Sequence, residues 1–187
     1  MASQKESDLQ KRMSMPRQRS AKLEGFDEET KTVTMSFASE TPCLDYWGDK
    51  EILRCNDKAM DTQRFTDGVM PILYNHERDI VIGKPTKIWT ENGRAMATIE
   101  FAGTEKAQEI MGLVRDGFLN GVSVGYRVMQ WEVVEKGETS DDGIEGLAWI
   151  ATRWEVFEIS IVTVPADGTK LYPFVKTNLK EKKRILP

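Results

Sequence analysis

The stretch Val122–Trp131 reads VSVGYRVMQW, and its apolar residues alternate along the chain as they do in a half-buried β-strand. Val122, Val124, Tyr126 and Val128 would share one face of that strand, and Ser123 would project from the opposite face. The residues just before it predict an α-helix over 104–116, which Thr104 can cap and Gly117 can end. A helix that leads into a long strand is thus the centre of the predicted fold.

Strand composition recurs on both sides of this unit. The predicted strands cover residues 32–38, 51–54, 69–74, 86–90, 94–101, 147–152 and 155–164. Glu91-Asn92-Gly93 supplies a hairpin turn, because Asn-Gly tolerates positive φ, and residues 135–146 form an acidic loop. The pattern predicts a β-rich α+β fold, a small antiparallel β-barrel or sandwich with flanking helices packed outside.

Composition and charge limit the class of protein. The chain has 187 residues, 40% hydrophobic and 30% charged, which is typical of a globular domain and excludes a wholly disordered chain. The sequence contains neither a run of 18 apolar residues nor the apolar core of a signal peptide. It therefore predicts neither a membrane protein nor a secreted protein. Only two cysteines occur, too few for a disulfide scaffold, so reduced thiols in a cytoplasm are expected. No cofactor is expected.

The charge divides the chain into three parts. Residues 1–24 carry +3, residues 25–169 carry −12 and residues 170–187 carry +5. We predict a disordered basic arm at 1–24, a folded domain at 25–169 and a basic C-terminal tail at 170–187. The acidic body is a poor candidate for specific nucleic-acid binding, because phosphates repel it.

Three residues could carry chemistry. His76 is the chain's single histidine and follows an apolar run, where it could act as a general base or be a structural residue. Ser123, flanked by glycines two residues away on each side, could be a nucleophile or a strand serine that faces water. Glu158 shares a face with Val156 and Ser160 by alternation, so its carboxylate needs a partner, either an imidazole or a basic side chain.

Three segments together resemble a known family. Tyr74-Asn75-His76-Glu77, the string from Asn120 to Tyr126, and the string from Trp154 to Asp167 occur in this order, with a helix before the serine. This arrangement resembles the prohead proteases of tailed phages, which are serine peptidases related in fold to the herpesvirus assemblins. The resemblance spans about residues 32–168 and implies a herpesvirus-protease-like barrel.

The resemblance also implies roles for the candidate residues. Ser123 would be the nucleophile and His76 the general base. Assemblins use a second histidine, which this chain lacks, so the third member would be acidic. Glu158 is the first choice, with the four alternatives Glu155, Asp167, Glu77 and Asp79.

A role in capsid maturation follows from the same resemblance. The expected substrates are the major capsid protein, its scaffolding segment and the chain itself, inside the assembling prohead in the host cytoplasm. A homo-oligomer is expected, with a dimer as one option, and no membrane partner. Two other hypotheses stay open: a non-catalytic scaffold or capsid-assembly module of the same fold, and a metal hydrolase that uses His76, Glu77 and Asp79.

Overall fold

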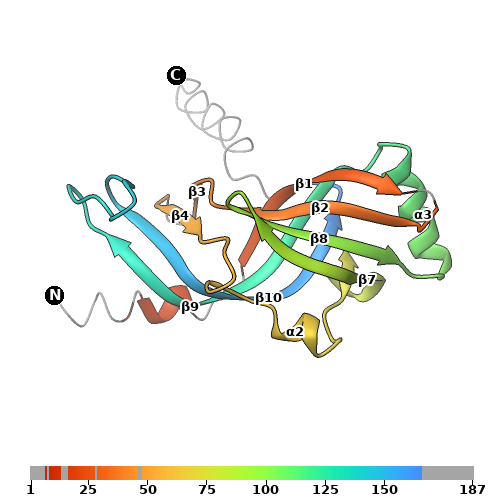
Figure 1. Cartoon of the computed structure of the whole chain (residues 1–187), viewed down its shortest axis with the longest axis horizontal. Helices are drawn as coiled ribbons and strands as arrows, with labels where there is room; N and C mark the ends of the chain where they lie inside the picture. The colour runs from red at the N-terminus through yellow and green to blue at the C-terminus, as the bar shows by residue number, and fades with distance from the viewer. Residues whose placement is uncertain (1–6, 8, 14–16, 28, 46–47, 166–187) are drawn as a thin grey trace, which may run out of the picture.

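The computed structural model describes residues 7, 9–13, 17–27, 29–45 and 48–165, and one large sheet dominates it (Figure 1). The strands are β1 (Arg17–Asp27), β2 (Thr32–Ser39), β3 (Cys43–Leu44), β4 (Lys50–Leu53), β5 (Met60–Asp61), β6 (Ile72–Tyr74), β7 (Glu77–Glu91), β8 (Arg94–Phe101), β9 (Gly121–Val134) and β10 (Ala148–Val162). The strands are accompanied by the helices α2 (Gln63–Thr66) and α3 (Glu105–Arg115). The β-rich prediction is confirmed.

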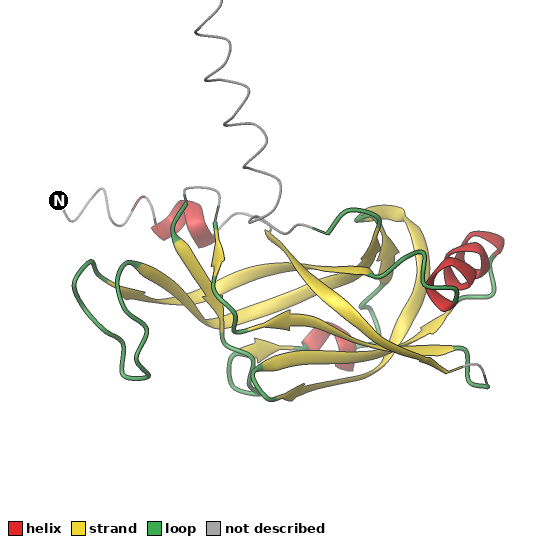
Figure 2. Ribbon diagram, turned by 90° about the horizontal axis from the view of Figure 1, so that it is seen from above, coloured by secondary structure: helices red, strands yellow, loops and turns green. Residues whose placement is uncertain are grey.

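The sheet curls into a half-barrel, with α3 against one end (Figures 1 and 2). Its strands follow the order β3-β4-β10-β6-β7-β8-β2-β1-β9, and β9 also pairs with β10. The path of pairings that leaves β10 through β6 therefore returns to β10 through β9. This makes β9 and β10 the two strands on which both halves of the sheet meet.

The prediction of a purely antiparallel sheet is wrong. β4, β5 and β6 pair in succession along β10, and all three run parallel to it. These short strands are separated by turns and by α2, so residues 50–74 run alongside β10 in broken steps. Strands of two to four residues are too short to produce a recognisable period, which explains why the sequence suggested no parallel pairing.

The locally encoded elements lie where they were predicted. β2 buries Val33, Met35 and Phe37, and Asn92 adopts the expected positive φ of 50° between β7 and β8. α3 begins after Thr104, whose side chain accepts a hydrogen bond from the Ala107 amide. Val69, expected in a buried strand, is 59% exposed, because the strand β6 begins only at Ile72.

The C-terminal strands are one element. The two predicted pieces 147–152 and 155–164 form the continuous strand β10, which is irregular between Ala151 and Trp154 and again between Val156 and Glu158. The first irregularity lies at the predicted gap, so the pairing bends there instead of breaking. A β-bulge, in which one strand has an extra residue, bends that strand while the pairing continues on both sides of it.

The prediction of a disordered arm at 1–24 is wrong for its second half. Residues 9–13 are helical, and Arg17–Asp27 form β1. β1 pairs with β9 over Arg17–Lys22 and with β2 over Lys22–Asp27. Backbone pairing with β9 and with β2 holds β1 in the sheet. This strand can therefore form without a sustained alternation of apolar residues in its sequence. The predicted tail 170–187 lies outside the described residues.

Aromatic rings anchor the core between β9 and β10. Tyr126 and Trp154 are fully buried and meet edge to face, with ring centroids 5.8 Å apart. The indole N–H of Trp154 donates to the Arg54 carbonyl at 2.8 Å, and the Tyr126 hydroxyl donates to Glu51 at 2.5 Å. Each polar atom of these rings is therefore satisfied inside the core, as buried aromatic residues require.

The N-terminal helical residues are held by one arginine. Arg12 is 5% exposed, forms ion pairs with Asp45 and with Asp49 (2.6 Å for the latter), and stacks on Trp149 at 3.9 Å from the ring centroid. The side chain of Asp45 is itself almost fully buried. Two carboxylates and an aromatic face thus compensate for burial of the guanidinium.

Replacing Arg12 tests whether this contact holds the N-terminal segment. Arg12→Ala should lower the free energy of unfolding by about 3 kcal/mol, because Asp45 would stay buried without its arginine. Urea unfolding measures the change, and Lys58→Ala, at an exposed lysine, is the matched control and should change it by less than about 0.5 kcal/mol. Equal stability of the two variants would contradict the prediction.

Candidate active site

His76 occupies a tight and strained turn between β6 and β7. Tyr74 pairs with Glu77, so Asn75 and His76 form a two-residue hairpin loop. Both are left-handed, with φ of 52° and 62°. Such turns favour Asn followed by Gly, because a side chain in this conformation costs roughly 1–2 kcal/mol. A histidine at the glycine position is therefore kept at an energetic cost, as strained residues at functional sites are.

Asn75 ties this turn to the end of β10. The backbone N–H of Asn75 donates to the Ile161 carbonyl at 3.0 Å. The side-chain Oδ1 of Asn75 accepts from the backbone N–H of Thr163 at 2.9 Å. The Asn75 side chain is thus hydrogen-bonded to the residue just beyond β10, and the Asn75 backbone continues the pairing of β6 with β10. These contacts fix the left-handed turn against the strand that carries Glu158.

His76 and Glu158 are in direct contact. Nδ1 of His76 lies 2.7 Å from Oε1 of Glu158, and the two side chains are 19% and 14% exposed. An ionised carboxylate can only accept, so Nδ1 carries the hydrogen and Nε2 of the neutral ring keeps its lone pair. The contact therefore selects the tautomer in which Nε2 can take up a proton.

Ser160 contacts both members of this pair. Its hydroxyl donates to Oε2 of Glu158 at 2.6 Å and accepts from the backbone N–H of His76 at 3.2 Å. Alternation along the sequence predicts that Ser160 lies on the face of Glu158, but it indicates no role for this serine. The Glu-x-Ser spacing on one strand was the available signal, because residues i and i+2 lie on the same face.

Ser123 lies across the sheet from Ser160. The two residues are direct partners in the β9–β10 pairing, so their side chains project from the same face, typically with Cβ atoms about 5 Å apart. Ser123 is fully buried, and its hydroxyl makes no hydrogen bond within the described part of the chain, with His76 or any other residue. An unpartnered buried hydroxyl is costly and therefore points to a functional role.

Gly125 makes room for the carboxylate. It pairs with Glu158, and a Cβ atom added at Gly125 would lie 2.3 Å from Oε1 of Glu158. Any other residue here would displace the oxygen that contacts the imidazole. Because Gly125 and Ser123 share a face of β9, the carboxylate lies over the same face as the Ser123 side chain.

The alternation assigned to Glu158 needs one correction. Val156 pairs with Tyr126 and faces the core, whereas Glu158 pairs with Gly125 on the other face. The two therefore do not share a face as the sequence predicted. The irregularity at Phe157 changes the alternation, and as a result the carboxylate leaves the core side of the sheet.

The other acidic candidates are engaged elsewhere or lie apart. Glu155 forms ion pairs with Arg64 at 2.9 Å and with Arg127 at 2.6 Å. Glu77 and Asp79 are exposed on β7. Asp167 lies outside the described residues. In the described part of the chain, Glu158 is the carboxylate in contact with His76.

Over the described ranges, no three His, Cys, Asp or Glu side chains gather as a metal-binding group. None of the helices there is long and apolar enough to cross a membrane.

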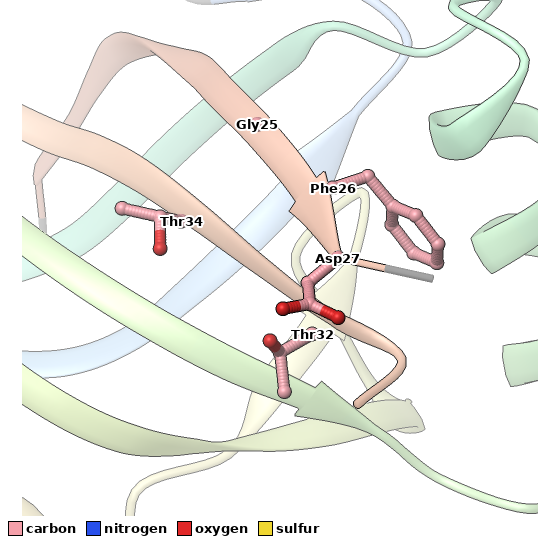
Figure 3. Close-up of a pocket in the computed structure, with 5 residues that line it drawn as sticks. All are labelled: Gly25, Phe26, Asp27, Thr32 and Thr34. Carbon is pink, nitrogen blue, oxygen red and sulfur yellow. The ribbon is translucent and has the colours of Figure 1, made fainter. Parts of the chain in front are cut away.

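A shallow pocket of about 420 Å³ lies at the β1–β2 hairpin (Figure 3). It is lined by Gly25, Phe26, Asp27, Thr32 and Thr34. Oδ1 of Asp27 accepts the Glu29 and Thr30 amides at 2.9 Å, and the Thr30 amide above all holds the pKa of Asp27 below its ordinary value of 3.8. Asp27 thus stabilises the turn between β1 and β2. None of the residues that line the pocket is His76, Ser123, Glu158 or Ser160.

The constellation has the parts of a nucleophilic hydrolase. A carboxylate contacts an imidazole, and on the same sheet face lies a serine hydroxyl that has no hydrogen-bond partner among the described residues. Imidazole bases activate serine nucleophiles in this way, and hydrogen-bond contact between base and nucleophile often forms only with substrate.

The chain is similar to parts of two phage capsid proteins. The chain is 36% identical over 139 residues to the major capsid protein of Halomonas phage phiHAP-1, covering 72% of this chain and 22% of that protein. It is 27% identical over 124 residues to the capsid polyprotein of Pseudomonas phage PAJU2, covering 63% of this chain and 17% of that protein. The chain thus spans about a fifth of the length of these curated relatives. No solved structure matches significantly.

A family model gives the assignment. The model of the caudovirus prohead serine proteases matches residues 22–184, which include β9, β10 and the turn that holds His76. This span is much more than half of the chain. The chain therefore belongs to the caudovirus prohead serine protease family.

Proposed function

We propose that this chain is a serine endopeptidase in which Ser123 is the nucleophile, His76 the general base and Glu158 the acidic third member. The single observation that carries the proposal is the 2.7 Å contact of Nδ1 of His76 with Glu158, with Ser123 on the same face of the sheet. Membership of the prohead protease family supports it independently.

The mechanism is acyl transfer to serine. Nε2 of His76 removes the hydroxyl proton of Ser123 while its oxygen attacks the peptide carbonyl, and the imidazolium then gives this proton to the leaving amine. Water, deprotonated by the same imidazole, hydrolyses the acyl-enzyme and restores the serine. Glu158 holds the ring and stabilises the imidazolium without taking the proton itself.

We further propose that the peptidase acts in capsid maturation. Its substrates would be the major capsid protein with its scaffolding segment, and the chain itself, inside the assembling prohead in the host cytoplasm. The naming of both relatives as capsid proteins supports this placement. The curled sheet would be the small barrel of herpesvirus-type proteases, and a homo-oligomer, a dimer for instance, would be the working form.

A non-catalytic scaffold of the same fold is the second candidate. The capsid names of both relatives are the observation that favours it, because the chain resembles a part of longer capsid proteins. Mass spectrometry of the purified chain separates the two functions. Self-trimming that disappears in Ser123→Ala supports the peptidase, whereas identical masses together with uncut co-expressed capsid precursor support the scaffold.

Substitution of the three residues tests the peptidase directly. Cleavage of co-expressed capsid precursor should fall by about 10⁶-fold in Ser123→Ala and His76→Ala, and by about 10⁴-fold in Glu158→Gln, which keeps the shape but loses the charge. Gel analysis of the precursor over time measures this. Ser36→Ala, at another buried serine, should cleave normally.

Full cleavage by a folded Ser123→Ala protein would refute the assignment of the nucleophile. Activity that resists a chelator and depends on Ser123 would argue against the metal-hydrolase hypothesis. Circular dichroism of each variant checks that loss of activity is not loss of fold.

The strained turn gives a separate prediction about stability. His76→Gly and His76→Ala both remove the imidazole and should both be inactive, but the glycine variant should be more stable by about 0.5 to 1 kcal/mol. The reason is the positive φ of 62° at this position, which glycine adopts freely. Urea unfolding of both variants measures the difference.

The matched control uses Arg78, exposed on the neighbouring strand β7. At Arg78 the order should reverse, with alanine more stable than glycine, because glycine weakens a strand. If alanine is the more stable residue at both positions, the left-handed turn at His76 is not strained.

A further inference from the structure

We propose that Ser160 is a positioning residue, whose single hydroxyl couples the orientation of Glu158 to the position of His76. The inference rests on the proposed function and extends it to a fourth member. Its basis is the pair of hydrogen bonds of Ser160, one to the carboxylate and one from the His76 backbone.

The first part of the inference concerns the carboxylate. Oε1 of Glu158 contacts the imidazole at 2.7 Å, and Oε2 accepts from the Ser160 hydroxyl at 2.6 Å. With both oxygens engaged from different directions, the carboxylate cannot rotate without losing a bond. Without Ser160, only the contact with His76 would hold it, and the side chain could turn away.

The second part concerns the imidazole. The Ser160 oxygen accepts the His76 amide, which belongs to the left-handed turn between β6 and β7. The same atom therefore fixes both the backbone of the base and the carboxylate that orients its ring. Displacements of a few tenths of an ångström at such contacts lower turnover, because reacting groups must be closely aligned.

The third part separates Ser160 from the nucleophile. A serine hydroxyl has one hydrogen, and that of Ser160 points to Glu158. The hydroxyl of Ser123, on the facing strand, has no partner within the described residues and is free to be deprotonated by Nε2. The two buried serines thus have different tasks although they face each other across the β9–β10 pairing.

The test uses the fact that His76 is the chain's only histidine. In a ¹⁵N-histidine-labelled chain, the Nδ1–H proton gives one downfield NMR signal that needs no assignment. Ser160→Ala should shift or broaden this signal, and Ser160→Cys, which keeps the shape with a weak donor, should do so less. Ser36→Ala, at a buried serine on β2, is the control and should leave it unchanged.

Kinetics on a capsid-precursor peptide complete the test. Ser160→Ala should lower kcat by about 10- to 100-fold and change KM by less than about twofold, since substrate contacts stay intact. Ser160→Cys should lie between Ser160→Ala and the parent chain, and is the variant to use if alanine impairs folding. A covalent serine probe should still label Ser123 in both.

Two results would overturn the proposal: an imidazole signal unchanged in both Ser160 variants, or a kcat within about threefold of the parent in both. Failure of the proposed function has a different signature. If the parent chain hydrolyses no precursor and Ser123 takes no probe, the peptidase assignment fails. The imidazole signal then still decides whether Ser160 positions His76.

Discussion

The antiparallel pairing of β9 with β10 is the constraint on which the rest of the structure depends. It places Ser123 opposite Ser160 and Gly125 opposite Glu158, and its other face supplies the core residues Val124 and Tyr126. A slip of one residue would turn every side chain of one strand to the opposite face. Core packing on one face therefore fixes the alignment of Ser123, Ser160 and Glu158 on the other.

Contacts with the surrounding sheet hold the locally unfavourable features of the candidate site in place. Three features are each locally unfavourable: the left-handed turn at His76, the mostly buried carboxylate of Glu158, and the hydroxyl of Ser123, which has no partner in the described part of the chain. Backbone contacts of Asn75 with the end of β10 hold the turn, and a glycine at 125 gives the carboxylate space. The unfavourable features are concentrated in one place, where the surrounding sheet is most extensively paired.

The sequence predicted what short-range periodicity determines. β2, the β7–β8 hairpin, α3 and β9 follow from alternation, a capping threonine and an Asn-Gly turn, because neighbours in sequence decide these elements. The parallel pairing of residues 50–74 along β10 and the irregularity at Phe157 depend on distant partners and left no local signal. Resemblance to a family selected His76, Ser123 and Glu158, whereas the two hydrogen bonds of Ser160, to Glu158 and from His76, arise only when distant strands are brought together.

The position of β1 limits how a peptide can reach Ser123. β9 pairs with β10 on one side and with β1 on the other, where Ser20 is the partner of Ser123. Because both edges of β9 are occupied there, an extended substrate cannot join it as a further strand while β1 is paired. In the proposed mechanism, the scissile carbonyl would therefore approach from the face that holds His76 and Glu158. Since Ser123 is fully buried, the proposed attack on a peptide would require a rearrangement that exposes its hydroxyl.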